Sequence, residues 1–303
     1  MSTGSGTGGK PVLVVLAAGM AKRFGGGCKP LAPLGLHGEA VIDLNAGDAL
    51  RGGFGPVVLV LGPQTGPAIE YHVRRIWPER VEVGFALQPV ALGTAHAVLC
   101  ARSLVGDRPF AVINADDVYG TPAFETLAGH LAGGTGHALV GYPLADTVVT
   151  DDPVTRGTCE VDAGGSLVRM AERKLVSRQP DGTFRSADGR EPADLDPATP
   201  VSMNLWGLLP SVWPVLEEAV LGTHPEVAPD GTLGSPPAST TEVLLPEVIG
   251  NLADSGRAEV RVLPGSGRCV GVTHYDDLPA TRAELALMVA EGQRRETPWE
   301  GLP

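Results

Sequence analysis

Residues 11–30 read PVLVVLAAGMAKRFGGGCKP, an apolar run followed at once by a glycine-rich loop with three basic side chains, Lys22, Arg23 and Lys29. A continuous apolar run of this kind predicts a strand that is buried on both faces. Glycines behind such a strand let backbone N–H groups approach an anion, because a Cβ would otherwise obstruct them. Ligands of open parallel sheets bind at the carboxyl ends of the strands. The stretch therefore predicts an anion-binding loop on an α/β sheet, although it matches neither the GxxxxGK[ST] nor the GxGxxG spacing.

The rest of the first half repeats this alternation of strand-like and helix-like segments. Further short strands are expected at PVVLVLG, VEVGFALQ, RPFAVINA and HALVGYPL, and helices near 40–51, 65–76, 94–104 and 122–132. The alternation predicts an α/β fold of Rossmann-like type, with a mixed, mainly parallel sheet flanked by helices.

The pattern changes after about Val148. GTCEVDAGGSLVRMAER, residues 157–173, predicts a small β hairpin across a Gly-Gly turn, and the segment 177–200 predicts a long loop. The remaining expected elements are a strand at VSMNLWGLLP, a helix at 211–220, a polar loop at 224–239, a helix at 241–252, a strand at AEVRVLPG and a closing helix at 276–291.

Composition narrows the function classes. The chain has 303 residues, 43% of them hydrophobic, as expected for a soluble globular protein. Its net charge of −12 argues against nucleic acid or an anionic membrane as a partner, because phosphate-rich surfaces require clustered cations. The four cysteines stand singly, which indicates reduced thiols. No apolar run reaches membrane-spanning length and no signal-peptide core is present, so a cytoplasmic location is expected.

Two further motifs bear chemistry. NADDVYG, residues 114–120, places paired carboxylates at the end of an apolar strand, where they suit Mg²⁺. The alternative is an Asx turn or a helix N-cap before Thr121. In LQPVALGTAHAV, Gln88 and the following Gly93-Thr94 can present amide and backbone groups to a nucleobase, or Gly93-Thr94 simply starts a helix. Acids facing a basic loop at one sheet edge favour a site for a metal–polyphosphate.

In this order, LAAGMAKRFGG-CK, ALQPVALGTAHAV, NADDVYG and VSMNLWG resemble the sugar-phosphate nucleotidyltransferases, from about Val12 to Leu287. The likeness is strongest to a bacterial branch with LAAGMGSRFGGLK, GTGHAVL, NADDFYG and VSMNMWG signatures. The resemblance implies an enzyme that joins an NTP and a sugar 1-phosphate into an NDP-sugar and pyrophosphate, with Mg²⁺ as cofactor. No nucleic-acid or membrane partner is expected, and self-association of the chain stays open.

The resemblance also implies residue roles. The catalytic residues would be Arg23, Lys29 and Asp116. The nucleotide would be bound by Leu16, Ala17, Ala18, Gly19, Gln88, Gly93 and Thr94. The sugar would be bound by Asp117, Glu172 and Asn204, and Mg²⁺ by Asp116 and Asp276. From the residues alone, Glu172 can equally form a surface ion pair and Asn204 a turn amide.

Three departures from the family pattern stand out. Ala21 replaces a loop glycine, Cys28 precedes Lys29 where many relatives have Pro or Leu, and Thr273 competes with Asp276 as second metal ligand.

The resulting expectation is a disordered tail at 1–10 and a single domain at 11–303. That domain would comprise a nucleotide-binding half at 11–145, a sugar-phosphate-binding half at 146–275, and a C-terminal helix and tail at 276–303. Two other functions stay open: nucleotidyl transfer to a non-sugar phosphate acceptor, and a catalytically silent paralogue that binds nucleotide sugar and regulates a partner. The identity of the base and of the sugar is likewise undecided.

Overall fold

Four parallel strands form the centre of the sheet in a computed structural model that describes residues 9–19, 28–148, 152–271 and 278–302. These are β1 (Val12–Ala17), β2 (Val57–Leu61), β3 (Val83–Leu87) and β4 (Phe110–Asn114), arranged in the order β4–β1–β2–β3. Ala17 lies opposite Leu61, Leu61 lies opposite Leu87, and Leu16 lies opposite Asn114. The carboxyl ends of all four strands therefore lie level at one edge of the sheet.

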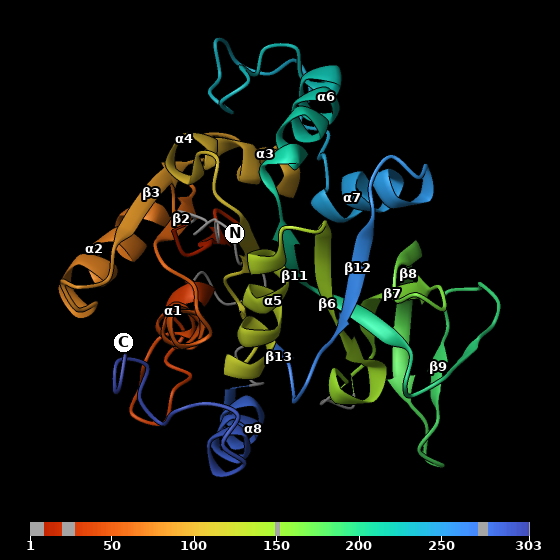
Figure 1. Cartoon of the computed structure of the whole chain (residues 1–303). Helices are drawn as coiled ribbons and strands as arrows, with labels where there is room; N and C mark the ends of the chain where they lie inside the picture. The colour runs from red at the N-terminus through yellow and green to blue at the C-terminus, as the bar shows by residue number, and fades with distance from the viewer. Residues whose placement is uncertain (1–8, 20–27, 149–151, 272–277, 303) are drawn as a thin grey trace, which may run out of the picture.

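Helices cover both faces of this parallel centre (Figure 1). Leu13 and Val15 belong to a buried cluster with α1 (Val41–Arg51), α2 (Gly66–Ile76) and α5 (Thr121–Gly133). Val12 and Val14 belong to a second cluster with α3 (Thr94–Cys100), α4 (Arg102–Val105), α6 (Trp213–Thr223) and α7 (Leu245–Asp254). Because β1 is apolar at every position, it can be buried on both faces, as its sequence predicted.

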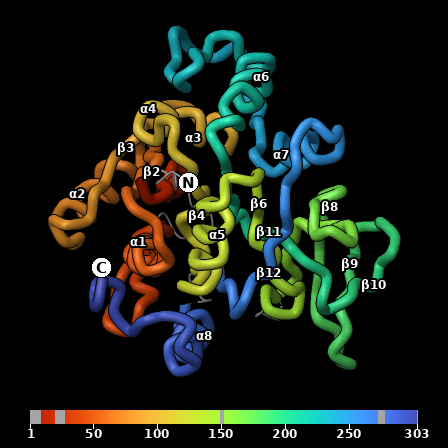
Figure 2. Tube along the Cα trace, viewed as in Figure 1, coloured from red at the N-terminus to blue at the C-terminus, as the bar shows by residue number. Residues whose placement is uncertain are grey.

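The second half of the chain extends the sheet mainly through antiparallel pairing. The strand β11 (Pro200–Leu208) runs antiparallel to β4 and to β6 (His137–Pro143), and β12 (Val260–Pro264) pairs parallel with β6. The hairpin of β7 (Val154–Val161) and β8 (Leu167–Arg178) continues from β11. Beyond it lie the short strands β9 (Phe184–Ser186) and β10 (Asp194–Leu195), which form an arm on the side of the molecule away from α2 (Figure 2).

A small two-stranded sheet completes the fold near the end of β4. Its strands are β5 (Asp117–Val118) and β13 (Val270–Gly271), and they pack on α8 (Leu278–Ala290) through the buried side chains of Val118, Val270 and Leu285. Short 3₁₀ helices occur at Lys29–Leu31, Leu144–Asp146 and Pro210–Val212. The predicted fold class, a mixed α/β sheet of Rossmann-like type flanked by helices, is confirmed. No helix in the described ranges is long and apolar enough to cross a membrane.

Three local expectations were wrong. The segment 177–200 is not one long loop, because the end of β8 and the strands β9 and β10 form an antiparallel arm there. The helix expected at 94–104 is divided, because Ala101 N bonds to Val98 O in an i→i−3 turn that ends α3. The helix expected at 241–252 begins only at Leu245, because Val243 instead exchanges backbone hydrogen bonds with Leu92 and Ala95.

Candidate functional site

A cation and a carboxylate meet at the carboxyl ends of the neighbouring strands β1 and β4. Lys29 Nζ lies 3.4 Å from Asp116 Oδ2, although the two residues are 87 positions apart in the chain. The Lys29 side chain is 17% exposed and that of Asp116 39%, so the carboxylate is still open to a ligand. Arg23, predicted to act beside Lys29, lies outside the described residues.

Asp117 is half-buried beside this pair. Its Oδ2 accepts a hydrogen bond of 2.9 Å from Asn114 Nδ2, and its backbone oxygen accepts one of 2.7 Å from Asn45 Nδ2. A Cβ at Gly271, which lies opposite Asp117 in the small sheet, would stand 2.3 Å from Asp117 Oδ1, so a larger residue there would displace this carboxylate oxygen. Burial, reinforced by the charge of Asp116, raises the pKa of Asp117 to about 7. Near neutral pH this carboxyl group can therefore either donate or accept a hydrogen bond.

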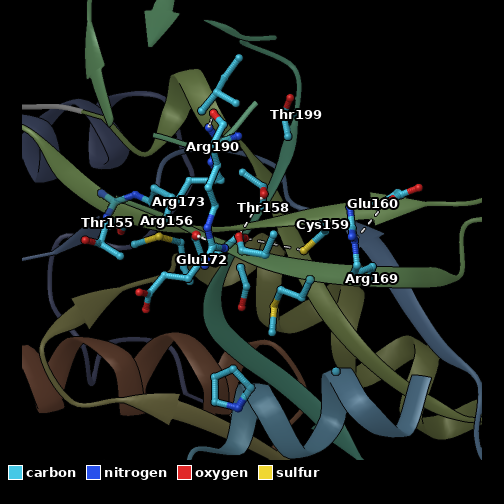
Figure 3. Close-up of a pocket in the computed structure, with 18 of the residues that line it drawn as sticks. Thr155, Arg156, Thr158, Cys159, Glu160, Arg169, Glu172, Arg173, Arg190 and Thr199 are labelled. Atoms are coloured by element: carbon cyan, nitrogen blue, oxygen red, sulfur yellow. Dashed lines mark hydrogen bonds and ion pairs between the residues drawn. The ribbon is translucent and has the colours of Figure 1, made fainter. Parts of the chain in front are cut away.

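Asp117 also lines a large cavity of about 1350 Å³ that extends over the second half of the chain. The predicted sugar-binding residues Glu172, on β8, and Asn204, on β11, line the same cavity. Figure 3 shows Glu172 on the β7–β8 strand pair, with Arg190 projecting from the arm nearby. The structure thus brings together all three side chains that were predicted to bind the sugar.

The backbone at Asn204 is unusual for a strand. The pairing of β11 with β6 is irregular between Ser202 and Trp206, and Asn204 there has a φ of +61°. Asparagine adopts this left-handed conformation more readily than most residues, and bulges of this kind redirect side chains beside binding sites. The Asn204 Oδ1 atom accepts a hydrogen bond of 3.3 Å from Trp206 Nε1. Asn204 is therefore a strand-bulge residue at the cavity wall.

Glu172 takes part in an ion pair as well as lining the cavity. Its Oε1 lies 3.1 Å from Lys174 Nζ, and both side chains are more than half exposed. Glu172 can therefore both form the surface ion pair with Lys174 and line the cavity.

The neighbouring Arg173 has a different environment. Its Nε donates to Asp188 Oδ2 over 2.9 Å, with both side chains buried, and its Nη2 donates to the backbone oxygens of Arg190 and Pro192. The hydrogen bond from Arg173, together with those from the backbone N–H groups of Arg190 and Lys174, holds the pKa of Asp188 well below its ordinary value. Arg173 thereby anchors the arm segment 188–192 beside the cavity, a role that its position in a charged, exposed-looking strand did not indicate.

The predicted nucleotide-binding residues lie along the same sheet edge. Leu16 and Ala17 end β1, and Ala18 and Gly19 follow it. Gln88, Gly93 and Thr94 follow β3, and β2 lies between β1 and β3. Among the described residues, no heavy atom lies within 4 Å of the place where a Cβ at Gly19 would stand.

The loop after β3 packs against a late part of the chain. Gly93 has a φ of +96°, and a Cβ there would lie 2.3 Å from Val243 O. The Thr94 hydroxyl accepts a hydrogen bond of 2.8 Å from Leu245 N. Gly93-Thr94 therefore does start a helix, and the start of this helix packs against residues 243–245.

Oxygen ligands for a hard cation are present at the Lys29 end of the site. Carboxylates of the Asp116 kind suit Mg²⁺, which takes one or two carboxylates together with phosphate oxygens. Within the described ranges, no cluster of three or more His, Cys, Asp and Glu side chains is placed to hold a metal. Asp276 and Thr273 lie outside those ranges, so the second ligand stays a prediction.

Comparison with known proteins identifies the family to which the chain belongs. The nucleotidyl transferase family matches residues 12–172, more than half of the chain, and the protein belongs to that family. The bifunctional protein GlmU of Pelobacter propionicus is 33% identical over 175 residues, which are 55% of this chain and 34% of the relative. GlmU of Anaeromyxobacter dehalogenans is 38% identical over 130 residues, 42% of this chain and 25% of the relative. The match thus spans only about a third or a quarter of the length of these relatives.

A solved structure shares the fold along nearly the whole chain. The crystal structure of UDP-glucose pyrophosphorylase complexed with UDP-glucose covers 92% of this chain and 99% of its own, with a TM-score of 0.62 and 18% identity. At that identity the likeness concerns the fold. The resemblance to sugar-phosphate nucleotidyltransferases that the motifs indicated is confirmed at the level of family and fold.

Proposed function

We propose that this nucleotidyltransferase joins an NTP and a sugar 1-phosphate to give an NDP-sugar and pyrophosphate. The observation that carries the proposal is the adjacency of two features. The Lys29–Asp116 pair lies near the carboxyl ends of β1 and β4, and Asp117, the next residue in the chain, lines the cavity that Glu172 and Asn204 also line. The family membership, the GlmU relatives and the fold of UDP-glucose pyrophosphorylase support the same chemistry.

In the proposed reaction, a phosphate oxygen of the sugar 1-phosphate attacks the α-phosphorus of the NTP. A new P–O bond forms, the bond from the α-phosphorus to the α,β-bridging oxygen breaks, and pyrophosphate leaves with that electron pair. The nucleophile is already an anion, so the protein needs no covalent intermediate and no general base. Its tasks are to hold two anions in line and to neutralise the charge that develops between them.

Lys29 is assigned to the α-phosphate, where its ammonium group would offset the added charge of the five-coordinate transition state. Arg23 is assigned to the departing pyrophosphate, which its planar guanidinium can bind through two oxygens. Asp116 is assigned to Mg²⁺, together with Asp276. When bound, the ion would supply further charge neutralisation on the phosphates.

The acceptor side of the proposal rests on hydrogen-bonding chemistry. Glu172 offers carboxylate oxygens, Asn204 an amide, and Asp117 a carboxyl group whose pKa of about 7 lets it donate or accept. Such a set matches the hydroxyl groups of a hexose or a sugar-like polyol. We assign nucleotide binding to 11–145 and acceptor binding to 146–275, to which Asp117 contributes from the first half. The four unpaired thiols support a cytoplasmic location.

The test is a pyrophosphate-release assay with Mg²⁺, in which ATP, GTP, CTP, UTP and dTTP are each paired with a panel of sugar 1-phosphates. We expect release that requires both an NTP and one class of sugar 1-phosphate and that stops with EDTA. Release only with a non-sugar phosphate would assign the enzyme to another acceptor class. Tight binding of nucleotide sugar without turnover at any pair would identify a silent paralogue.

A further inference from the structure

His96, on α3, lies against the side chain that was predicted to contact the nucleobase. The imidazole is fully buried, and Gln88 is only 5% exposed. Gln88 Nε2 lies 3.3 Å from His96 Nδ1 and 2.9 Å from Gly93 O. On its other side, His96 Nε2 lies 2.9 Å from the backbone oxygen of Gly231.

The partners of the ring determine its tautomer. A backbone oxygen only accepts hydrogen bonds, so the 2.9 Å contact with Gly231 O requires the proton on His96 Nε2. Cys100 Sγ, which lies 3.5 Å from both His96 Nε2 and Gly231 O, then donates its own proton to Gly231 O. Burial lowers the pKa of His96, which favours the neutral ring. In a neutral imidazole protonated at Nε2, the other nitrogen is an acceptor. His96 Nδ1 therefore accepts a hydrogen bond from Gln88 Nε2.

This tautomer in turn orients the Gln88 amide. The two hydrogens of Nε2 are both used, one by Gly93 O and one by His96 Nδ1. A rotated amide would place its oxygen against two acceptors, which is unfavourable. Gln88 Oε1, to which none of the described residues donates, is then the group left for a ligand.

We propose that His96 is a positioning residue for base recognition, which holds the Gln88 amide so that its Oε1 acceptor alone meets the nucleotide. The inference rests on the proposed function and on the prediction from the sequence that Gln88 contacts the base. A fixed acceptor favours a base that offers an N–H group at this contact over one that offers only an acceptor there. His96 itself touches no substrate and acts through Gln88.

The anchor of this arrangement comes from a distant part of the chain. Gly231 belongs to the polar segment 224–239 and lies 135 positions beyond His96. Its φ is +81°, and a Cβ there would lie 2.6 Å from Cys100 N, so the turn fits against α3 only as glycine. Gly231 N also donates to Ala228 O over 2.9 Å, which closes the turn. The position of the Gly231 oxygen is thus set by close packing on the helix that carries His96.

The test compares two substitutions that each keep one half of the imidazole. In His96→Asn the side-chain oxygen can occupy the place of Nδ1 and still accept from Gln88, whereas His96→Gln keeps a group near Nε2 and loses that acceptor. His137→Gln is the matched control. His137 is also buried, and its Nδ1 accepts from Leu209 N, but it lies at the start of β6, away from the carboxyl ends of the parallel strands.

We expect His96→Gln to raise the KM for the preferred NTP about tenfold, the size of one lost hydrogen bond that orients a binding group. The kcat at saturating NTP and the acceptor KM should stay within about threefold, and the preference over the next-best NTP should fall. His96→Asn and His137→Gln should keep NTP KM values within about threefold of wild type. Wild-type KM and base preference in His96→Gln, or equal KM increases in all three variants, would overturn the proposal.

Calorimetric titration of the NTP alone separates this inference from the proposed reaction. If the wild-type protein binds NTP but releases no pyrophosphate, the reaction is wrong, and the Kd values of the same variants still decide the role of His96. A Kd about tenfold weaker in His96→Gln but not in His96→Asn supports it, and equal Kd values refute it. If the wild-type protein binds no NTP, both proposals fail.

Discussion

Substitution of Lys29 by alanine should separate catalysis from stability. Within the described ranges the side chain forms one ion pair, at 3.4 Å from Asp116, and the carboxylate of that pair is 39% exposed. Two unit charges at such a distance attract by about 1 kcal/mol in a water-like dielectric, and exposed pairs usually contribute still less after side-chain entropy is included. The free energy of unfolding should therefore change by no more than about 1 kcal/mol.

The expected effect on the reaction is larger because Lys29 is assigned to charge that appears only in the transition state. Loss of one such group typically lowers kcat by about 10²–10³-fold, equivalent to roughly 3–4 kcal/mol. Lys29→Arg, which keeps the positive charge but changes its geometry, should fall between wild type and alanine.

The assay is Mg²⁺-dependent pyrophosphate release, with urea unfolding of the same preparations. Arg257→Ala, which breaks an exposed ion pair of 2.8 Å with Glu218, is the matched control and should keep the wild-type kcat. If Lys29→Ala retained more than about a third of wild-type kcat, or lost activity only in proportion to unfolded protein, the assignment of Lys29 to the α-phosphate would be refuted.

Three further predictions concern the acceptor cavity and the core. Asp117→Asn should raise the free energy of unfolding of metal-free protein at pH 8 by up to about 4 kcal/mol, because the pKa of Asp117 is about 7 in the folded state against about 3.9 in an unfolded chain. Below about pH 4 both states bind the proton, so the advantage should vanish there, and a pH-independent difference in urea unfolding would contradict the reasoning. Asn204→Gly preserves a backbone that tolerates a φ of +61° and removes the amide. It should raise the acceptor KM about tenfold with an unchanged NTP KM, and equal increases in both would argue against contact with the sugar. Arg294→Met leaves buried Asp48 without the guanidinium that lies 3.2 Å from its Oδ2. It should cost about 3–5 kcal/mol in denaturant unfolding, and a loss below about 1 kcal/mol would show that the pair is not needed.

The parallel centre of the fold was predictable because its signal is local and strong. Each of its strands is a short apolar run, and in β1 and β2 nearly every residue is buried, so two covering layers of helices follow from composition alone. The arm at 177–200 was missed for the opposite reason. Its strands β9 and β10 have three and two residues, too few to display an alternation. Phe184 and Leu195 are buried only where β9 pairs with β8 and β10 pairs with β9.

The meeting of Lys29 and Asp116 could be anticipated, because residues that end neighbouring parallel strands must share one edge of the sheet. The placement of Glu172 and Asn204 on one cavity came from family resemblance, since nothing local in MAER or VSMNLWG indicates it. The anchoring of 188–192 by Arg173 carried no sequence signal, because a buried arginine and an exposed one look alike in sequence.

Local composition thus decided the strands, their double-sided burial and the edge at which anions would bind. Tertiary contacts alone decided the hydrogen-bonding direction of His96 and the position of the Asp117 carboxyl group. The tautomer of His96 depends on the backbone oxygen of Gly231. The position of the Asp117 carboxyl group depends on the absence of a side chain at Gly271. Hydrogen-bond direction and close approach depend on distances between atoms far apart in the chain, and such distances exist only once the chain has folded.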